Sequence, residues 1–355
     1  MAHIVVIGGG PYGGTVANRL QKTGAKITLI SRSEKALLLP AMIRLPFHKD
    51  PSRVSVELKD ILNPNIELMI DQVVNVDESQ VDLGAHDPVS FDRLVIATGA
   101  VWDDPIAPHK YQQNGIQEYA KEVAGLGEKA NNIVLVGGGA LGVELAGEYA
   151  YHFPKKSITL IHSEKKLLDA SAIDKVRDSV ESQLRGLKVK LILGKKAEIR
   201  GQSVFVDGEE VPCDYLIKTT GPKANPPVSS IKGLVNEKNE IIISSKFQAE
   251  CNPKIYAIGD VTNYPKRGLV SRENWLSIIT HNLNEDIKGT SNYRTVDWPK
   301  QGVKSKSTFA VSVGPEGGAG QYILPFGCAF SLPRFAVVKA KSSTLFYSKL
   351  NSMFI

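Results

Sequence analysis

Two stretches of this chain repeat one pattern of apolar, glycine and amphipathic positions. The first runs from His3 to Leu20 (HIVVIGGGPYGGTVANRL) and the second from Asn132 to Tyr149 (NIVLVGGGALGVELAGEY). In each, a β-branched apolar run leads into a glycine cluster and then into a helical pattern with small residues on one face. Another apolar run follows each of them, at 26–30 and at 157–161. The sequence therefore predicts two βαβ openings, each typical of a parallel sheet flanked by helices.

Each repeat also has an exit. The apolar run 91–97 ends in the turn Thr98-Gly99, and a matching turn ends at Gly221 before a proline-rich segment. Further apolar segments follow at 240–244 and at 255–258, and the latter ends in Gly259-Asp260. We therefore expect an α/β fold with two Rossmann-like doubly wound nucleotide-binding domains, one inserted in the other. The predicted bounds are 1–104 with 222–301 for the outer domain, 105–221 for the inserted domain, and 302–355 for a small C-terminal unit.

Composition limits the class of protein. The chain has 355 residues, of which 42% are hydrophobic and 23% charged, enough for two or three packed units of a soluble globular protein. Cys213, Cys251 and Cys328 form no CxxC pair, which disfavours a disulfide scaffold and a dithiol redox centre. This cysteine usage indicates a reducing compartment. No apolar run reaches the roughly 18–20 residues that a membrane-spanning helix needs.

The positive charge is concentrated near the C-terminus. The formal net charge is +6, and residues from Val303 onward hold six Lys or Arg against Glu316 alone, a net +5. Aromatic residues alternate with these basic ones, a pattern that suits a membrane headgroup region. The alternative is that the aromatics form the core of the C-terminal unit. Nucleic acid is a less fitting partner, because the basic residues are few and widely spaced.

The two glycine turns indicate nucleotide binding. In Gly8-x-Gly10-Pro11-x-Gly13 the first glycine permits a tight turn, the second lets the backbone approach a pyrophosphate, and the third allows close helix–strand packing. A helix that begins there offers free N–H groups to phosphates. The same spacing recurs in the second repeat, at Gly137, Gly139 and Gly142. One such turn is weak evidence, whereas two in the same strand–turn–helix context predict two dinucleotide sites.

Other residues at strand ends and turns are candidate nucleotide contacts. Asp260 can reach the ribityl chain of a flavin nucleotide, and a helix from about Gly268 would direct its positive end at the flavin ring. The acidic residue that usually ends the second strand is absent: Ser31-Arg32 and His162-Ser163 occupy the two positions. With Lys165 and Lys166 nearby, although Glu164 weakens the argument, we expect use of both NADH and NADPH. The remaining candidates are Thr98, Gly99, Gly221 and Gly259.

Two carboxylates follow the second glycine turn. Glu144 and Glu148 are four residues apart, so they share a helix face. There they can position a nicotinamide ring or pass a proton, and we predict both as catalytic residues. The alternative is that they lie at a domain interface.

Three motifs, GGGPYGG, LVIATGA and YAIGD, resemble those of the pyridine-nucleotide-disulfide-oxidoreductase-like flavoproteins. Within that class, four further segments resemble the apoptosis-inducing-factor-like proteins, in particular the fungal members and the ferroptosis-suppressor type. They are LPAMIRL at 39–45, the His162-Ser163 pair, Gly268-Leu269-Val270 with Asn274-Trp275, and VSVGPEGGAGQ at 311–321. The resemblance covers essentially the whole chain.

The resemblance implies an enzyme that holds FAD in the outer domain and NADH or NADPH in the inserted one. Electrons would then pass to a quinone or another small acceptor. Pro40 and Arg44 would border the flavin, and no metal is implied. The myristoylated animal proteins have glycine after the initiator Met, whereas this chain has Ala2. We therefore expect a cytoplasmic protein that contacts a membrane, such as the mitochondrial outer membrane or a lipid droplet, through its C-terminal unit.

Several alternatives stay open at this point. The enzyme can instead be an NAD(P)H oxidase or a ferredoxin-type reductase. A protein of another class would be a redox-regulated cell-death signalling protein with nucleic-acid affinity. A homodimer is compatible with the sequence, which does not determine the oligomeric state.

Overall fold

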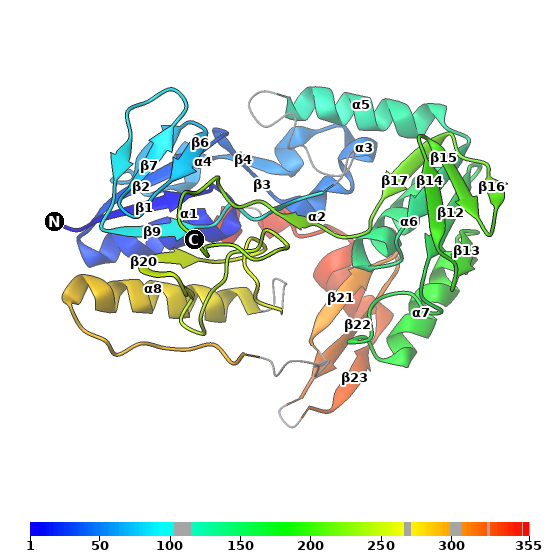
Figure 1. Ribbon diagram of the computed structural model, residues 1–355. Coiled ribbons are helices and arrows are strands. Elements are labelled where there is room, and N and C mark those ends of the chain that lie inside the picture. Colours follow the sequence, from blue (N-terminus) through cyan, green and yellow to red (C-terminus); the bar gives the residue numbers. More distant parts are fainter. Residues whose placement is uncertain (103–114, 266–270, 299–306, 325–326, 350, 355) are drawn as a thin grey trace.

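The computed structural model describes the chain except residues 103–114, 266–270, 299–306, 325–326, 350 and 355. It has two lobes, and a small sheet lies against their junction (Figure 1). We call the lobe built around the N-terminus the outer unit, the other lobe the inserted unit, and the residues from 307 onward the C-terminal unit.

The outer unit is organised by a sheet with the strand order β19-β20-β9-β1-β2-β5. Pairing from β20 through β5 is parallel, and the edge strand β19 is antiparallel. The bounds are β1 (His3–Ile7), β2 (Lys26–Ser31), β5 (Glu67–Ile70), β9 (Arg93–Ile96), β19 (Gln248–Ala249) and β20 (Asn252–Ala257). The central strands β1, β2 and β9 are mostly apolar and buried, as expected where helices cover a parallel sheet.

Helices and small sheets complete the outer unit. The two longest helices, α1 (Pro11–Leu20) and α8 (Arg272–Lys288), pack together, and the rings of Tyr12 and Trp275 stack 6.1 Å apart. Shorter elements are η1 (Gln21–Thr23), β3 (Lys35–Leu37), α2 (Leu39–Met42), α3 (Leu45–His48), η2 (Pro51–Arg53), β4 (Ser55–Glu57), α4 (Leu58–Ile61) and the meander β6 (Val73–Val76), β7 (Gln80–Leu83) and β8 (Val89–Ser90).

The inserted unit repeats this plan with a four-stranded parallel sheet in the order β13-β12-β11-β17. Its bounds are β11 (Asn132–Val136), β12 (Ser157–His162), β13 (Lys190–Leu193) and β17 (Tyr215–Lys218), with helices α5 (Ile116–Lys129), α6 (Ala140–His152) and α7 (Asp174–Gly186). A second meander consists of β14 (Ala197–Arg200), β15 (Ser203–Val206) and β16 (Glu209–Val211). The repeat of sheet and meander agrees with the repeat in the sequence.

The chain crosses between the units twice, side by side. The outgoing strand β10 (Ala100–Val101) pairs antiparallel with the returning strand β18 (Lys223–Ala224). Afterwards β20 pairs with β9, so the chain rejoins the first sheet. The predicted α/β class, with one doubly wound unit inserted in the other, is confirmed. The residue bounds predicted for the domains stay predictions.

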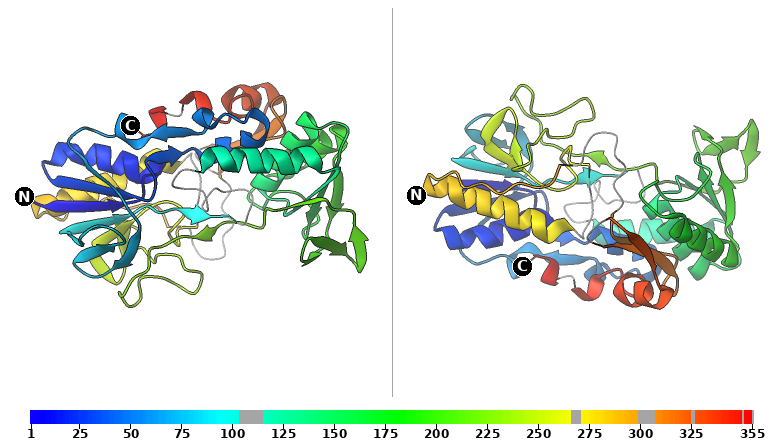
Figure 2. Two further views of the ribbon diagram at one scale, coloured as in Figure 1. Left: turned by 90° about the horizontal axis from the view of Figure 1, so that it is seen from above. Right: turned by 90° about the horizontal axis from the view of Figure 1, so that it is seen from below.

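The C-terminal unit is an antiparallel sheet of β21 (Phe309–Ser312), β22 (Gly318–Ile323) and β23 (Ala329–Leu332), followed by α9 (Arg334–Val337), η5 (Val338–Ser342), η6 (Tyr347–Lys349) and η7 (Asn351–Phe354). Its sheet packs on the inserted unit, where the Gln321 side chain bonds to Ile173 and Ser171. Its last residues return to the outer unit, as Figure 2 shows, and Asn18 of α1 donates to the Phe354 carbonyl at 2.9 Å. The C-terminal unit therefore links the other two.

Two segments singled out in the sequence need a further description. The helix expected from about Gly268 begins at Arg272, and residues 266–270 lie outside the described part of the chain. The apolar segment 240–244 forms only isolated bridges, through Ile241 and Ile243. It runs beside β19 and the turn after β20 instead of adding a strand to the sheet.

Candidate active site

The first glycine turn joins β1 to α1 at very close range. Gly8 has φ +111°, and a Cβ atom there would lie 2.6 Å from the Ala97 carbonyl oxygen. A Cβ atom on Gly13 would overlap the Gly8 carbonyl oxygen. Gly10 is the N-cap of α1, with no atom within 4 Å of its Cβ position, and Pro11 opens the helix. The turn is therefore tight on its protein side and open in front of the helix.

The second glycine turn has the same geometry. Gly137 has φ +118°, and its Cβ position lies 2.5 Å from the Thr219 carbonyl oxygen. A Cβ atom on Gly142 would overlap the Gly137 carbonyl oxygen, and the Cβ position of Gly139, the N-cap of α6, is again open. Neither α1 nor α6 has a side chain that caps its N-terminus or an acidic residue in its first turn. Their N–H groups and helix dipoles are thus arranged to receive phosphates.

The surroundings of the first turn fit FAD. The hydroxyl of Thr98, at the end of the strand next to β1, is buried without a hydrogen-bond partner in the protein. At the second turn, by contrast, the Thr219 hydroxyl donates to the Gly137 carbonyl at 2.7 Å. Gly259 has φ +87° and its Cβ position lies 3.0 Å from the Tyr12 ring, which brings the Gly259-Asp260 turn to the start of α1. Gly99 (φ +68°) and Gly221 (φ +117°) also occupy turns that favour glycine.

In the inserted unit, His162 at the end of β12 forms a hydrogen bond with the glycine turn. The Nδ1 atom of His162 accepts the N–H of Gly138 at 3.1 Å, so the neutral ring carries its hydrogen on Nε2. That Nε2 is buried and has no partner in the protein, and burial lowers the pKa of His162. The nucleotide-binding role of His162 stays a prediction. Lys166, by contrast, is held by Asp174 and Asp178, at 3.0 and 3.1 Å, which reduces its availability to a 2′-phosphate.

The outer unit's Arg32 follows β2 and is half-buried, and burial lowers its pKa. Pro40 is half-buried at the second position of α2. The nucleotide-binding roles of both stay predictions.

Glu144 faces the C-terminal unit. It is 7% exposed, and its Oε1 accepts from the backbone N–H and the hydroxyl of Ser312, at 3.1 and 3.3 Å. The same oxygen forms an ion pair of 2.6 Å with Lys341, whose ammonium also donates to the Ala310 carbonyl. Glu144 therefore joins the inserted unit to the C-terminal unit through a buried ion pair. The catalytic role of Glu144 stays a prediction.

Glu148, one turn later, is fully buried against the outer unit. Its Oε1 receives two hydrogen bonds from Arg44, at 2.9 Å from Nε and 2.6 Å from Nη2. Arg44 also donates to the carbonyls of Ser342 and Ser343, so this one ion pair joins all three units. The structure thus gives both residues an interface role, and their catalytic and flavin-bordering roles stay predictions.

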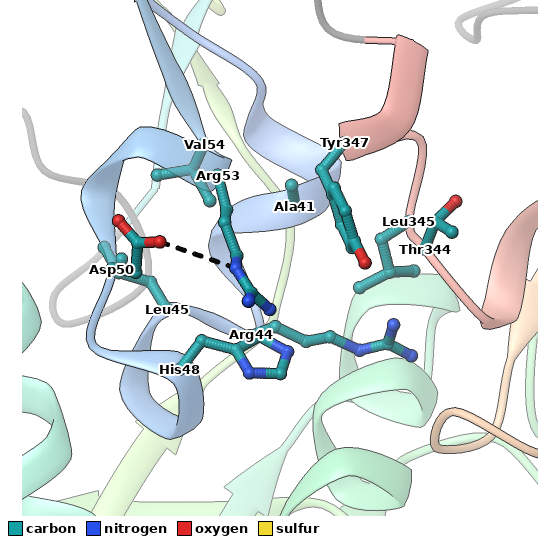
Figure 3. Close-up of a pocket in the computed structure, with 10 residues that line it drawn as sticks. All are labelled: Ala41, Arg44, Leu45, His48, Asp50, Arg53, Val54, Thr344, Leu345 and Tyr347. Carbon is teal, nitrogen blue, oxygen red and sulfur yellow. Dashed lines mark ion pairs between the residues drawn. The ribbon is translucent and has the colours of Figure 1, made fainter.

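A small pocket beside Arg44 is closed by the C-terminal unit (Figure 3). His48, Arg53 and Ala41 line it from the outer unit, and Thr344, Leu345 and Tyr347 from the C-terminal one. The Arg53 guanidinium lies 5.7 Å from the centre of the Tyr347 ring. Burial, with the nearby arginines, lowers the pKa of His48. The pocket marks where the C-terminal unit seals the segment that contains Pro40 and Arg44.

Sequence reasoning missed Lys341, Ser312 and Arg272. Lys341 was grouped with the basic residues of the C-terminus, and nothing local indicates that its partner is Glu144, almost two hundred positions earlier. Arg272 lies at the start of α8 and is 9% exposed, and only its place near the helix expected to face the flavin could have drawn attention to it.

Two findings concern the described residues alone. They contain no cluster of three or more His, Cys, Asp or Glu side chains that could hold a metal ion. None of their helices combines the length and hydropathy needed to cross a bilayer.

Comparison with known proteins places this architecture in a family. The family model for pyridine nucleotide-disulphide oxidoreductase matches residues 2–275. Apoptosis-inducing factor 1 of Saccharomyces cerevisiae is 32% identical over 99% of this chain and 98% of its own length. Ferroptosis suppressor protein 1 of Homo sapiens is 28% identical over 98% of this chain and 94% of its own length.

Solved structures share the fold. The sulfide:quinone oxidoreductase of Aquifex aeolicus superposes with a TM-score of 0.81 at 21% identity, covering 99% of this chain and 92% of that one. A ferredoxin reductase from Rhodopseudomonas palustris superposes with a TM-score of 0.69 at 16% identity, covering 90% and 88%. Together with the two glycine turns, the family match shows that the chain is an apoptosis-inducing-factor-like oxidoreductase that uses FAD and NADH or NADPH. It belongs to the pyridine nucleotide-disulphide oxidoreductase family.

Proposed function

We propose that this chain is an NAD(P)H:quinone oxidoreductase. The first glycine turn, Gly8 to Gly13, would hold FAD, and the second, Gly137 to Gly142, would hold NADH or NADPH. Together the two groups would supply hydride transfer and then electrons for a ubiquinone-like acceptor. The protein positions the two nucleotides, because hydride transfer between them needs alignment and no side-chain nucleophile. The proposal rests on the two matching glycine turns, which we call the cradles. In each, the first and third glycines lie against backbone atoms, and the Cβ position of the second glycine, at the helix N-cap, is open.

The choice of a quinone is supported by the comparisons. One structural neighbour is named a sulfide:quinone oxidoreductase, and its likeness extends over nearly the whole chain. No CxxC motif follows the first helix, so a thiol–disulfide acceptor is disfavoured. A second acceptor class, an iron–sulfur protein, is kept as an alternative because a ferredoxin reductase shares the fold.

Steady-state kinetics with three acceptors tests the quinone assignment. NADPH oxidation by the purified protein would be measured with a short-chain ubiquinone, with ferredoxin, and with oxygen alone. We expect kcat/KM for the quinone to exceed that for the other two by at least about tenfold, a difference of about 1.4 kcal/mol. Faster turnover with oxygen or ferredoxin would replace this proposal with an oxidase or a reductase.

We also propose that the protein is cytoplasmic and rests on a membrane through its C-terminal sheet. Tyr322 and Phe330 are register partners on β22 and β23, with rings 5.7 Å apart, and they are 45% and 46% exposed. Phe335 on α9 is 75% exposed, and the basic Lys339 is exposed two residues after that helix. Exposed aromatic rings beside basic residues suit the headgroup region of an anionic bilayer.

The other C-terminal aromatics behave differently. Phe354 is fully buried, and Phe309, Phe346 and Tyr347 are half-buried against the core, so the two interpretations of the aromatics each hold for a part of them. Lys341 is engaged with Glu144, which leaves fewer basic groups for lipid than the sequence suggested. Lys304, Lys306 and Phe326 lie outside the described residues.

Vesicle flotation tests the membrane surface. Vesicles of phosphatidylcholine with phosphatidylserine should float the wild-type protein, and Phe330→Ser with Phe335→Ser should lose most of that binding. Val228→Ser is the control, because Val228 is 70% exposed on the outer unit. Equal flotation of all three proteins would reject this surface.

A further inference from the structure

Arg272 is a buried cation at the start of α8. Its Nη2 carries two N–H groups, which are shared among three acceptors: the carbonyl of Pro11 at 2.9 Å, the hydroxyl of Thr15 at 2.6 Å and the carbonyl of Met353 at 2.5 Å. One guanidinium thus gathers the first turns of α1, the start of α8 and the end of the chain.

All of these acceptors are neutral. Among the residues that the structure describes, no carboxylate forms an ion pair with Arg272, and its Nε is buried without any partner. The neighbouring Glu273 is 71% exposed and pairs with Arg19 at 2.7 Å. Burial lowers the pKa of Arg272, yet an arginine side chain keeps its proton in proteins. A buried charge without a counter-charge is unfavourable, so this position calls for an anion that the described side chains do not provide.

Arg272 lies beside the first glycine turn. Pro11 is the first residue of α1, directly after Gly10, the N-cap whose front is open. The Arg272 guanidinium is 5.9 Å from the centre of the Tyr12 ring, and that ring contacts the Gly259 turn. The cation therefore shares the first turn of α1 with the glycine cradle and adds a full charge to the partial charge of the helix.

We propose that Arg272 is a further FAD-binding residue, whose guanidinium compensates the charge of the cofactor's diphosphate. The inference rests on the proposed use of the first glycine turn by FAD. No arginine of the described residues bonds to the first turn of α6, where the nicotinamide nucleotide must come and go. An extra cation at the first turn alone fits a cofactor that is retained while its partner exchanges.

The release of FAD from the holoprotein tests this role, with free-flavin fluorescence as the readout. Arg272→Gln keeps an NH₂ donor and removes the charge, whereas Arg272→Lys keeps the charge and loses the planar fork. We expect Arg272→Gln to release FAD about tenfold faster than wild type or more, and Arg272→Lys to stay within about threefold. The control is Arg19→Gln, which breaks the pair between Arg19 of α1 and Glu273, the neighbour of Arg272 on α8. It should release FAD like wild type.

Three results would overturn the inference. Arg272→Gln could keep FAD as firmly as wild type, or Arg272→Lys could lose it as fast as Arg272→Gln, which would make the residue a hydrogen-bonded clasp. The third is a lowered flavin midpoint potential without faster release, which would assign the charge to the reduced ring, because the oxidised ring is neutral. A wild-type protein without flavin would instead reject the proposed function itself.

Discussion

At each glycine turn, a single added methyl group would displace the helix from the strand that it packs against. Gly13 and Gly142 hold equivalent positions, and a Cβ atom on either would overlap the carbonyl of the first glycine of its turn. The close helix–strand contact fixes where the N–H groups of each helix begin. Although their geometry is the same, we expect Gly13 to control the binding of FAD and Gly142 the binding of the nicotinamide nucleotide.

Alanine at each position separates the two nucleotide sites. Gly13→Ala should lower the FAD content of the purified protein by about tenfold or more, because the first helix must move away from its strand. Gly142→Ala should keep the FAD and lose reduction by NADPH to a similar degree. Absorbance of the bound flavin before and after anaerobic NADPH measures both effects.

Gly125→Ala is the matched control, since its Cβ position within α5 is open. It should retain both properties and stabilise the protein by about 0.5–1 kcal/mol. Loss of FAD in Gly142→Ala, with retention in Gly13→Ala, would reverse the assignment of the two cradles.

Asp71 lies in the outer unit and forms hydrogen bonds with the backbone of a nearby loop. Its carboxyl group should make the free energy of unfolding depend on pH. Its carboxylate accepts the backbone N–H groups of Gln72, Ala85 and His86, and the His86 ring at 2.7 Å. Burial raises the pKa of Asp71, but these hydrogen bonds outweigh it and set the pKa to about 2, below the ordinary 3.8. The Asp71 carboxylate therefore stabilises the folded state at pH values above its pKa in the unfolded chain. This stabilisation is lost as the pH falls through the lower pKa of Asp71 in the folded protein.

Urea unfolding of wild type and Asp71→Asn measures this contribution. The wild-type free energy of unfolding should fall between about pH 4 and about pH 2, and the variant should fall less over that window because it has no carboxyl to protonate there. Parallel curves for the two proteins would show that Asp71 does not contribute to the acid dependence.

Helix α6 of the inserted unit contacts both of the other units. Its Glu144 pairs with Lys341 of the C-terminal unit, and its Glu148 with Arg44 of the outer unit. Because the helix starts at the second glycine turn, these two pairs fix that turn relative to the rest of the molecule. A change in either pair should therefore affect both stability and the approach of the nicotinamide nucleotide.

Removing one partner of the Arg44–Glu148 pair should be costly. Arg44→Met leaves the fully buried Glu148 carboxylate with only the His152 ring, 3.5 Å from its Oε2, and should cost about 3–5 kcal/mol of unfolding free energy. Arg44→Met with Glu148→Leu should recover much of that loss. Urea unfolding of the two single variants and the double variant gives the coupling between the residues.

The Lys49–Glu128 pair provides the control between the same two units. It is 2.6 Å long but about half exposed on both sides, so Lys49→Met should cost less than about 1 kcal/mol. A similar cost for Arg44→Met and Lys49→Met would show that the buried pair does not hold the units together.

The elements show where sequence reasoning succeeds and where it stops. Strands predicted at 3–7, 26–30 and 157–161 are β1, β2 and β12, because apolar periodicity and glycine turns are local signals. The partners of Glu144 and Glu148 lie far away in the sequence, at Lys341 and Arg44. Such contacts depend on how three units pack, which no local pattern encodes, so an interface role was only an alternative for both residues.

At the scale of the molecule, the C-terminal unit holds the assembly together. It pairs with the inserted unit through Lys341 and Gln321, and with the outer unit through Met353 and Phe354. Its exposed rings Tyr322, Phe330 and Phe335 are also the surface proposed to meet a membrane.

Coenzyme choice is a property of the inserted unit. The neutral His162 at the end of β12 brings no negative charge against a 2′-phosphate, while Lys166 is engaged by two aspartates. We expect kcat/KM values for NADH and NADPH within about a hundredfold of each other, a span of about 2.8 kcal/mol. A greater NADH preference, measured with one quinone, would contradict dual use.

The central claim is that FAD and a nicotinamide nucleotide occupy the two cradles and pass electrons to a quinone. Anaerobic absorption spectroscopy of the purified protein tests it in one cuvette. We predict a yellow protein whose flavin band bleaches on addition of NADPH and returns when a soluble ubiquinone is added. A colourless protein, or a flavin band that NADPH leaves unchanged, would contradict the account.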